Sequence, residues 1–71
     1  MKIQKQIKDI KFNYQNVYGE TMKVSEPIVI ASAAGWYVGA ICKTDGFVEP
    51  FDRYTDYVAT PEEAEKLMEA A

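Results

Sequence analysis

The sequence contains no histidine, so the side chains left that could do chemistry are chiefly acids, tyrosines and a single cysteine. Histidine is the commonest general base and metal ligand, so its absence excludes serine–histidine and cysteine–histidine catalysis. Cys42 alternates with apolar residues, which indicates a buried thiol, whereas a nucleophilic thiol needs a partly exposed, electropositive setting. We therefore predict no catalytic residues and no enzymatic activity.

Carboxylates are plentiful enough that a metal site or a hydrolytic acid pair must be considered. Asp45, Glu49, Asp52 and Asp56 fall within twelve residues, but they do not have the ligand spacing of a calcium loop. A hydrolytic pair would also need a cleft that so short a chain can hardly enclose. The sequence has no glycine-rich phosphate-binding motif. We expect no metal and no cofactor, and interpret these acids as solvated.

Aromatic residues gather around the same acids. Tyrosine, tryptophan and arginine dominate the residues that contribute most to protein interfaces, and aromatics beside acids suit a basic partner surface. The segment from Asp52 to Tyr57 is the best candidate for such a surface. The residues predicted to contact a partner are Tyr37, Glu49, Asp52, Arg53, Tyr54, Asp56 and Tyr57.

The net charge of −3 is unevenly distributed along the chain. Residues 1–23 hold five lysines against two acids, whereas residues 24–71 hold nine acids against three basic residues. Only the N-terminal lysines could therefore form the basic face that nucleic acid requires. One cysteine and no long apolar run predict a protein of a reducing cytoplasm that neither enters a membrane nor carries a signal peptide.

Hydrophobic alternation predicts an antiparallel sheet of three to four strands within a single domain, residues 1–71. The hydrophobic pattern of the first eight residues does not distinguish a strand from a short helix. The expected strands cover residues 9–14, then 21–24 with 28–32 as one strand interrupted at Pro27, then 36–43 and 47–54. Turns are expected at Tyr18-Gly19 and Asp45-Gly46, and Pro50 places the last strand at an edge or marks a bulge.

A single helix is predicted to follow the sheet. Thr60 is a suitable N-cap, Pro61 suits the first helical position, and Glu63 completes a capping box. An apolar stripe at helical spacing should then pack on one face of the sheet. That stripe consists of Ala64, Leu67, Met68 and Ala71. The fold class expected is therefore α+β.

Two family resemblances follow from these segments. The residues Trp36-Tyr37-Val38, a turn, a returning strand and the segment 57–64 are similar to the three strands and helix of arm-type DNA-binding domains of phage integrases. The segments 31–39, Pro50-Phe51-Asp52-Arg53 and 57–64 resemble small uncharacterised bacteriophage proteins over residues 28–68. Small, acidic phage proteins of this size include anti-CRISPR and other anti-defence proteins, which commonly block a nucleic-acid-binding surface on a bacterial complex.

Three functions remain open at this point. The first is a phage protein that binds and inhibits a bacterial host protein or defence complex through its acidic and aromatic surface. The second is a nucleic-acid-binding module that uses a lysine-rich first strand containing Lys5, Lys8 and Lys11. The third is an oligomeric protein that sequesters a signalling nucleotide.

Overall fold

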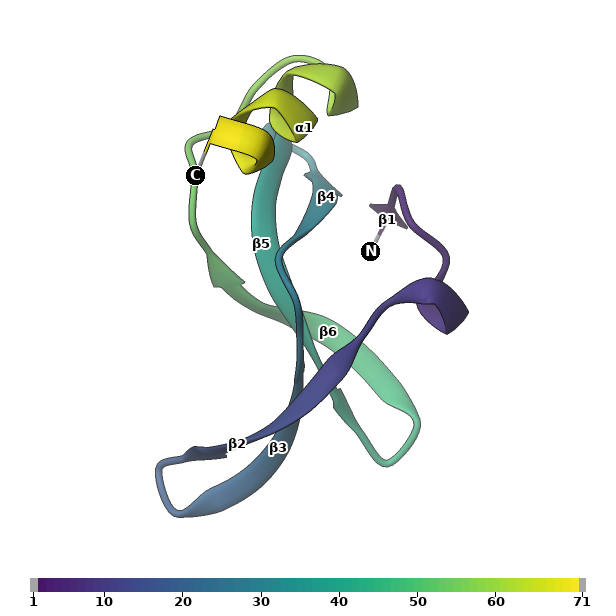
Figure 1. Cartoon of the computed structure of the whole chain (residues 1–71), viewed down its shortest axis with the longest axis vertical. Coiled ribbons are helices and arrows are strands. Elements are labelled where there is room, and N and C mark those ends of the chain that lie inside the picture. The colour runs from purple at the N-terminus through teal and green to yellow at the C-terminus, as the bar shows by residue number, and fades with distance from the viewer. Residues whose placement is uncertain (1, 71) are drawn as a thin grey trace.

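The computed structural model describes residues 2–70 as a strongly curled antiparallel sheet with one helix on one face (Figure 1). In chain order the elements are β1 (Lys2–Ile3), a 3-10 helix (Ile7–Asp9), β2 (Phe12–Val17), β3 (Glu20–Ser25), β4 (Ile28–Ser32), β5 (Gly35–Thr44), β6 (Phe47–Arg53) and α1 (Pro61–Ala70). Strand β5 is central: β6 pairs with one of its edges, while β3 and β4 share the other. Strand β2 flanks β3, and β1 flanks β4. The α+β expectation is met, but the sheet has six strands rather than three or four.

One of the two additional strands arises because the predicted second strand is split in two at Glu26 and Pro27. Val24 in β3 is opposite Cys42, and Ile28 in β4 is opposite Gly39, so both halves border the same edge of β5. Proline has no N–H to donate to the ladder, so the pairing is interrupted there. The other additional strand, β1, lies in the N-terminal segment whose pattern was ambiguous.

The first predicted strand begins three residues later than expected. Residues 7–9 form the 3-10 helix, Ile10 is buried beyond it, and β2 runs from Phe12 to Val17. Tyr14 alternates with apolar residues in the sequence, yet its side chain is 71% exposed. The reason is that the β2–β3 hairpin extends away from the body of the protein, beyond the reach of its core (Figure 1).

Both predicted two-residue turns are present. Tyr18-Gly19 and Asp45-Gly46 have positive φ at both positions, which matches the right-handed twist of the hairpins they close. Strand β6 carries an irregularity next to Pro50: Ile41 faces Pro50 but Ala40 faces Asp52, which leaves Phe51 as an extra residue. The expectation that Pro50 marks an edge strand or a bulge is confirmed on both counts.

The helix begins as predicted, since the Thr60 hydroxyl accepts a hydrogen bond from the Glu63 N–H at 3.2 Å. Its buried residue Ala64 packs against Val29 and Val38 on the outer face of β4 and β5, and Met68 is half-buried beside it. Leu67, predicted to share this stripe, is 38% exposed, because the i,i+4 pair of Ala64 and Met68 makes the contact with the sheet. Ala71 lies outside the described residues.

The opposite face of the sheet has its own core. Ile10, Ile28, Ile30, Tyr37 and Ile41 form this cluster. The strand expected at residues 36–43 is the central strand β5, and every residue from Tyr37 to Cys42 is buried, so apolar residues occupy both of its faces. Among residues 2–70, no helix is long and apolar enough to cross a membrane.

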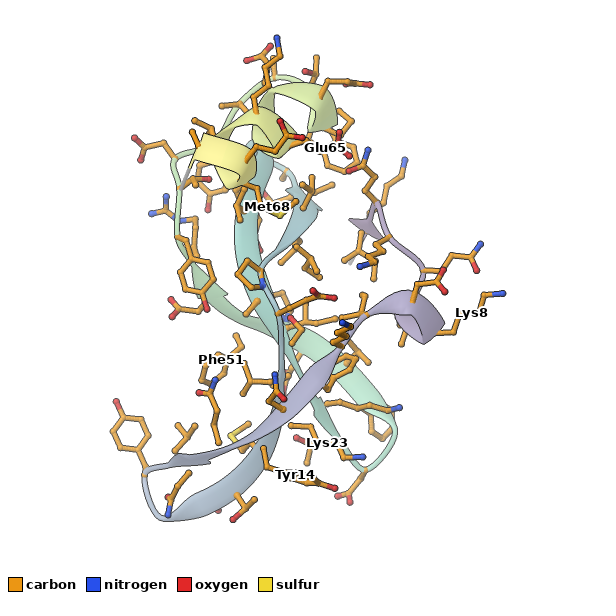
Figure 2. All side chains as sticks on the ribbon, viewed as in Figure 1. Lys8, Tyr14, Lys23, Phe51, Glu65 and Met68 are labelled. Atoms are coloured by element: carbon orange, nitrogen blue, oxygen red, sulfur yellow. The ribbon has the colours of Figure 1, made fainter. Side chains whose placement is uncertain are left out.

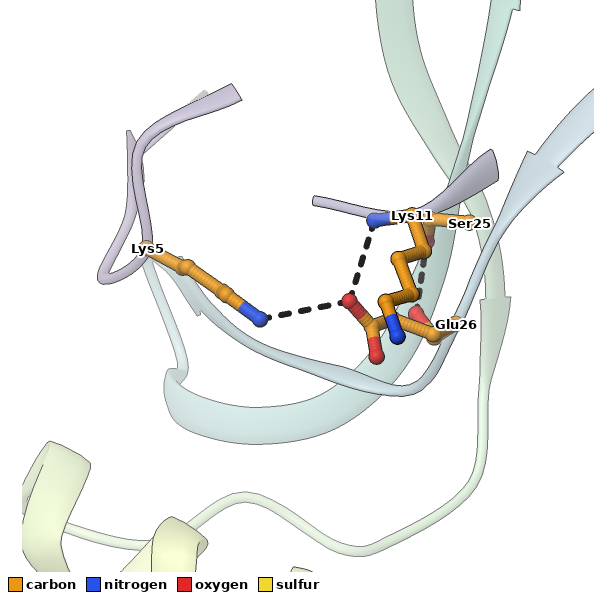
Figure 3. A network of polar contacts seen from close by, with 4 residues as sticks. All are labelled: Lys5, Lys11, Ser25 and Glu26. Atoms are coloured by element: carbon orange, nitrogen blue, oxygen red, sulfur yellow. Dashed lines mark hydrogen bonds and ion pairs between the residues drawn. The ribbon is translucent and has the colours of Figure 1, made fainter. Parts of the chain in front are cut away.

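Glu26, at the break between β3 and β4, ties the N-terminal segment to the sheet (Figure 3). Its carboxylate accepts hydrogen bonds from the Lys11 backbone N–H at 3.0 Å and the Lys5 ammonium at 3.2 Å. These two bonds, the backbone bond first, lower the pKa of Glu26 below its ordinary value of 4.5. The predicted lysine-rich first strand is therefore wrong: Lys5, Lys8 and Lys11 all precede β2, and Lys5 is paired with an acid.

Glu26→Gln is expected to lower the melting temperature near neutral pH and to have less effect in acid. A group whose pKa is lower in the folded state stabilises the fold above its unfolded pKa, and this stabilisation disappears as pH falls through the folded value. The difference in melting temperature between the two proteins should therefore shrink as pH falls below 4.5. Thermal unfolding followed by circular dichroism at several pH values, with exposed Glu69→Gln as control, measures it. A difference that is constant from neutral to acidic pH would contradict this role of Glu26.

Candidate partner-binding surface

From the last residue of β6, the chain forms a fixed loop on the way to α1, here called the aromatic loop (residues 53–58). The Arg53 guanidinium donates to the Thr55 carbonyl oxygen at 2.8 Å and lies 3.7 Å from the Asp56 carboxylate. It also covers the Tyr57 ring, with 4.8 Å between the guanidinium carbon and the ring centroid. Arg53, which ends β6, therefore holds the loop that follows it.

Contacts with β5 fix the other side of the aromatic loop. The Thr55 hydroxyl accepts a hydrogen bond from the Val38 N–H at 3.0 Å and donates to the Asp56 carbonyl oxygen at 3.0 Å. Val58 exchanges two backbone hydrogen bonds with Trp36, at 2.7 and 2.8 Å. The Tyr54 N–H also donates to the Val38 carbonyl oxygen at 2.8 Å, so hydrogen bonds to the β5 backbone hold both ends of the loop without a partner.

Tyr57 rests on Tyr37. The two rings meet edge to face, with centroids 5.5 Å apart and an interplanar angle of 79°. Tyr57 is 44% exposed, whereas Tyr37 is only 6% exposed. Burial, and secondarily the neighbouring Tyr57, raises the pKa of Tyr37 above its ordinary value. Tyr37 was predicted as a contact residue, and its burial makes it instead the support on which Tyr57 lies.

The space for Tyr37 depends on Gly39. A Cβ atom at position 39 would lie 2.8 Å from Cε2 of Tyr37 and would overlap the carbonyl oxygen of Asp52. Glycine therefore allows β6 and the Tyr37 ring to approach the β5 backbone closely. Because Tyr57 lies on Tyr37, the absence of a side chain at position 39 also helps to place Tyr57.

The remaining predicted contact residues separate into two groups. Asp52 lines a shallow hollow of about 240 Å³ together with Tyr37, Arg53 and Tyr57. Asp56 is exposed on the aromatic loop. Glu49, by contrast, is opposite Cys42 on the outer face of the sheet and so lies apart from Tyr57.

Tyr54 borders a feature that the sequence did not predict, an apolar groove beside the helix. The groove has a volume of about 500 Å³, and Tyr54 is 53% exposed at its rim. Its lining consists of Pro27, Val38, Tyr54, Thr55, Leu67 and Met68. A neighbouring hollow of about 570 Å³ shares Pro27 and Met68 with it and adds the charged side chains of Lys5, Glu26 and Glu65. Leu67, which a helical stripe alone would place against the sheet, is exposed and lines this groove.

The second feature missed is a basic and aromatic row on the inner face of the sheet. Lys23 and Lys43 are directly opposite each other on β3 and β5. The Lys23 ammonium lies 5.4 Å from the ring centroid of Tyr14, beside it in Figure 2, and the Lys43 ammonium lies 6.0 Å from that of Phe12. Like charges directly opposite each other destabilise a sheet. An anionic group bound between the two ammonium groups would reduce this repulsion. Glu20 and Asp45 border it.

Cys42 is buried, as predicted, in contact with Val24 and Ala40. Burial raises the pKa of its thiol, and the nearby Glu49 carboxylate raises it further. Both effects keep Cys42 in the unreactive thiol form near neutral pH. Residues 2–70 contain no group of three or more side chains placed to hold a metal ion.

No protein-family model matches the chain, and comparisons with curated proteins and with solved structures found no match.

Proposed function

We propose that this chain is a small bacteriophage protein that binds and inhibits a bacterial protein, in the manner of an anti-CRISPR protein. The observation that carries the proposal is the aromatic loop, which presents Tyr54, Asp56 and Tyr57 to solvent while Arg53 and Thr55 fix its backbone. The resemblance of residues 28–68 to small phage proteins supports the phage origin and the inhibitory role. The host cytoplasm would be its place of action.

A fixed loop is an efficient binding surface. Tyrosine offers a large contact area and loses little side-chain freedom, and a loop that is already ordered avoids the entropic cost of ordering on binding. Tyr57 lies over the sheet and Tyr54 borders the apolar groove, so a partner that covers the loop can insert a side chain on either side of it. The groove can receive an apolar side chain of that partner.

Charge indicates which kind of surface the partner presents. The acids Asp52 and Asp56 lie at the aromatic loop, and Glu62, Glu63 and Glu65 follow in α1. Complementary charges raise the association rate and orient the partner. The partner is therefore expected to present lysines and arginines of the kind that bind nucleic acid, which this protein would occupy in competition with the nucleic acid.

Affinity capture from bacterial lysate tests the proposal. The immobilised chain should retain a host protein at low salt and less of it at high salt, and purified partner should lose its nucleic-acid binding as the chain is added. Tyr57→Ala should weaken retention by about tenfold or more, as expected for a central aromatic of an interface. Tyr18→Ala, at an exposed tyrosine on the distant hairpin tip, is the matched control. The proposal fails if no protein is retained at either salt concentration, or if both substitutions act equally.

A second candidate function, nucleic-acid binding, is favoured by the opposed pair Lys23 and Lys43 with Tyr14 and Phe12. Lysines beside aromatic rings on a sheet face are typical of sheets that bind single-stranded nucleic acid, and of the two rings Tyr14 is exposed while Phe12 is half-buried. The same capture experiment distinguishes the two candidates. Retention of nucleic acid that is lost in Lys23→Glu but kept in Lys66→Glu, on the helix, would favour this second function.

A further inference from the structure

Strand β2 lies at one edge of the sheet. Within residues 2–70 it pairs only with β3, on one side, so its outer backbone groups have no strand to bond. Its six residues, Phe-Asn-Tyr-Gln-Asn-Val, include no charge and no proline, and its register with β3 is continuous. Natural proteins usually protect such edges with charges, prolines or bulges, because an open edge pairs with another strand.

The other long edge strand, β6, has all of these protections. It contains Pro50, a bulge beside that proline, and the charged residues Glu49, Asp52 and Arg53. The contrast between two edges of one small sheet indicates that β2 is kept available for pairing while β6 is not.

The direction of the backbone groups along β2 follows from its hydrogen bonds. The Glu26 N–H donates to the Lys11 carbonyl oxygen at 2.9 Å, and Val17 and Glu20 flank the two-residue turn. Both observations place the odd-numbered residues of β2 in hydrogen-bonded pairs with β3. Since the direction alternates along a strand, Phe12, Tyr14 and Asn16 direct their N–H and C=O groups to the open edge.

We propose that two copies of the chain form a symmetric dimer by antiparallel pairing of their β2 strands about Tyr14. In this register Tyr14 is opposite Tyr14 of the second copy, and Phe12 is opposite Asn16. All three outward residues of each copy then donate and accept a backbone hydrogen bond, and the two sheets become one. A twofold axis through one strand pair closes the assembly, as a dimer requires.

Side chains favour a second copy over a foreign strand as the occupant. The two Tyr14 rings would form an aromatic cross-strand pair, and Asn13 would face Gln15 on the other side of the sheet, where their amides can bond. No like charges become opposed at the new strand pair, because β2 carries none. A neutral strand also offers no charge by which a different partner would be selected. This inference is independent of the proposed function, since β2 contributes nothing to the aromatic loop.

Sedimentation of the full chain tests the dimer. Its mass should rise from 8.0 kDa towards twice that value as the protein concentration rises through the micromolar range. Tyr14→Lys places two like charges opposite each other and removes the aromatic pair, so it should weaken dimerisation by about tenfold or more. Asn16→Pro removes an outward N–H without removing a bond to β3, and should have a similar effect.

The control is Tyr18→Lys, the same change at an exposed tyrosine off the edge, which should leave dimerisation unchanged. If Asn16→Pro fails to fold by circular dichroism, Tyr14→Lys decides the outcome. A chain that stays monomeric at every concentration overturns the proposal, and so does a dimer that withstands both substitutions. A third outcome also overturns the proposal: the unsubstituted chain is monomeric and captures a host protein, and Tyr14→Lys loses that capture. The edge of β2 would then pair with a strand of the host protein rather than with a second copy.

Disulfide crosslinking tests the register. In a Cys42→Ala background, Tyr14→Cys should form an intermolecular disulfide on oxidation, because directly opposite hydrogen-bonded residues have Cα atoms about 5.5 Å apart, within the range of a disulfide. Asn16→Cys should not, since it faces Phe12. Efficient crosslinking at position 16 and none at position 14 would contradict pairing about Tyr14.

Discussion

Replacing Gly39 by alanine is expected to lower the free energy of unfolding by about 2–3 kcal/mol, which is large for the addition of one methyl group. The added Cβ would overlap the Asp52 carbonyl oxygen and press on the Tyr37 ring. The Asp52 backbone on one side and the buried Tyr37 ring on the other leave no room for the added methyl group unless one of them moves. Strand β6 must therefore move away from β5, and Tyr37 must leave its position in the core.

This substitution should also loosen the aromatic loop, because Tyr57 rests on Tyr37. Urea unfolding measures the loss of stability, and near-ultraviolet circular dichroism reports the tyrosine packing. Gly46→Ala is the matched control: a Cβ there meets nothing within 4 Å, but its φ of +84° is unfavourable for alanine. It should cost about 1–2 kcal/mol through the backbone alone and leave the tyrosine signal intact. Equal effects of the two substitutions on that signal would contradict close packing at Gly39.

Local signals made part of the fold predictable. The turn at Asp45-Gly46 and the helix start at Thr60-Pro61 depend on residues adjacent in the sequence, and both are found where they were predicted. The strand β5 was predictable because apolar residues occupy both of its faces. Such features require no knowledge of what lies across the sheet.

Features that depend on register were not predictable. Nothing near Lys23 in the sequence indicates that it lies opposite Lys43, because that pairing depends on how β3 and β4 share one edge of β5. Tyr14 alternates with apolar residues and Leu67 belongs to the predicted apolar stripe of the helix, but the core ends before it reaches either of them. Periodicity shows which side of an element is apolar, and only the tertiary structure shows how much of it is covered.

The candidate partner-binding surface was predicted only in part, because some of its residues are neighbours in the sequence while others meet only through strand pairing. Arg53, Asp56 and Tyr57 are close in sequence and also meet in space. Glu49 was grouped with them by sequence proximity, but strand alternation places it opposite Cys42 on the other face. The contribution of Gly39, fourteen residues before Arg53, arises only from the pairing of β5 with β6.

Ser25→Ala is expected to lower the free energy of unfolding by about 1–3 kcal/mol, because it leaves a buried backbone N–H without an acceptor. Where Glu26 and Pro27 interrupt the pairing with β5, the Ser25 hydroxyl takes the place of the missing strand. It accepts a hydrogen bond from the Ile41 N–H at 2.9 Å and donates to the Glu26 carbonyl oxygen at 2.8 Å. Ser25 and Ile41 are both buried, so water cannot replace the lost acceptor without opening the sheet.

Two measurements separate this effect from a general loss of packing. Urea unfolding gives the stability change, and amide hydrogen exchange should show that Ile41 loses more protection in Ser25→Ala than the global destabilisation explains. Ser32→Ala is the matched control, because that hydroxyl also bonds the backbone but is exposed, so its loss should cost about 0.5 kcal/mol or less. Unchanged relative protection of Ile41 would show that the hydroxyl does not bridge the break. The bridge explains how β3 and β4 can border the same edge of β5 on either side of Glu26 and Pro27.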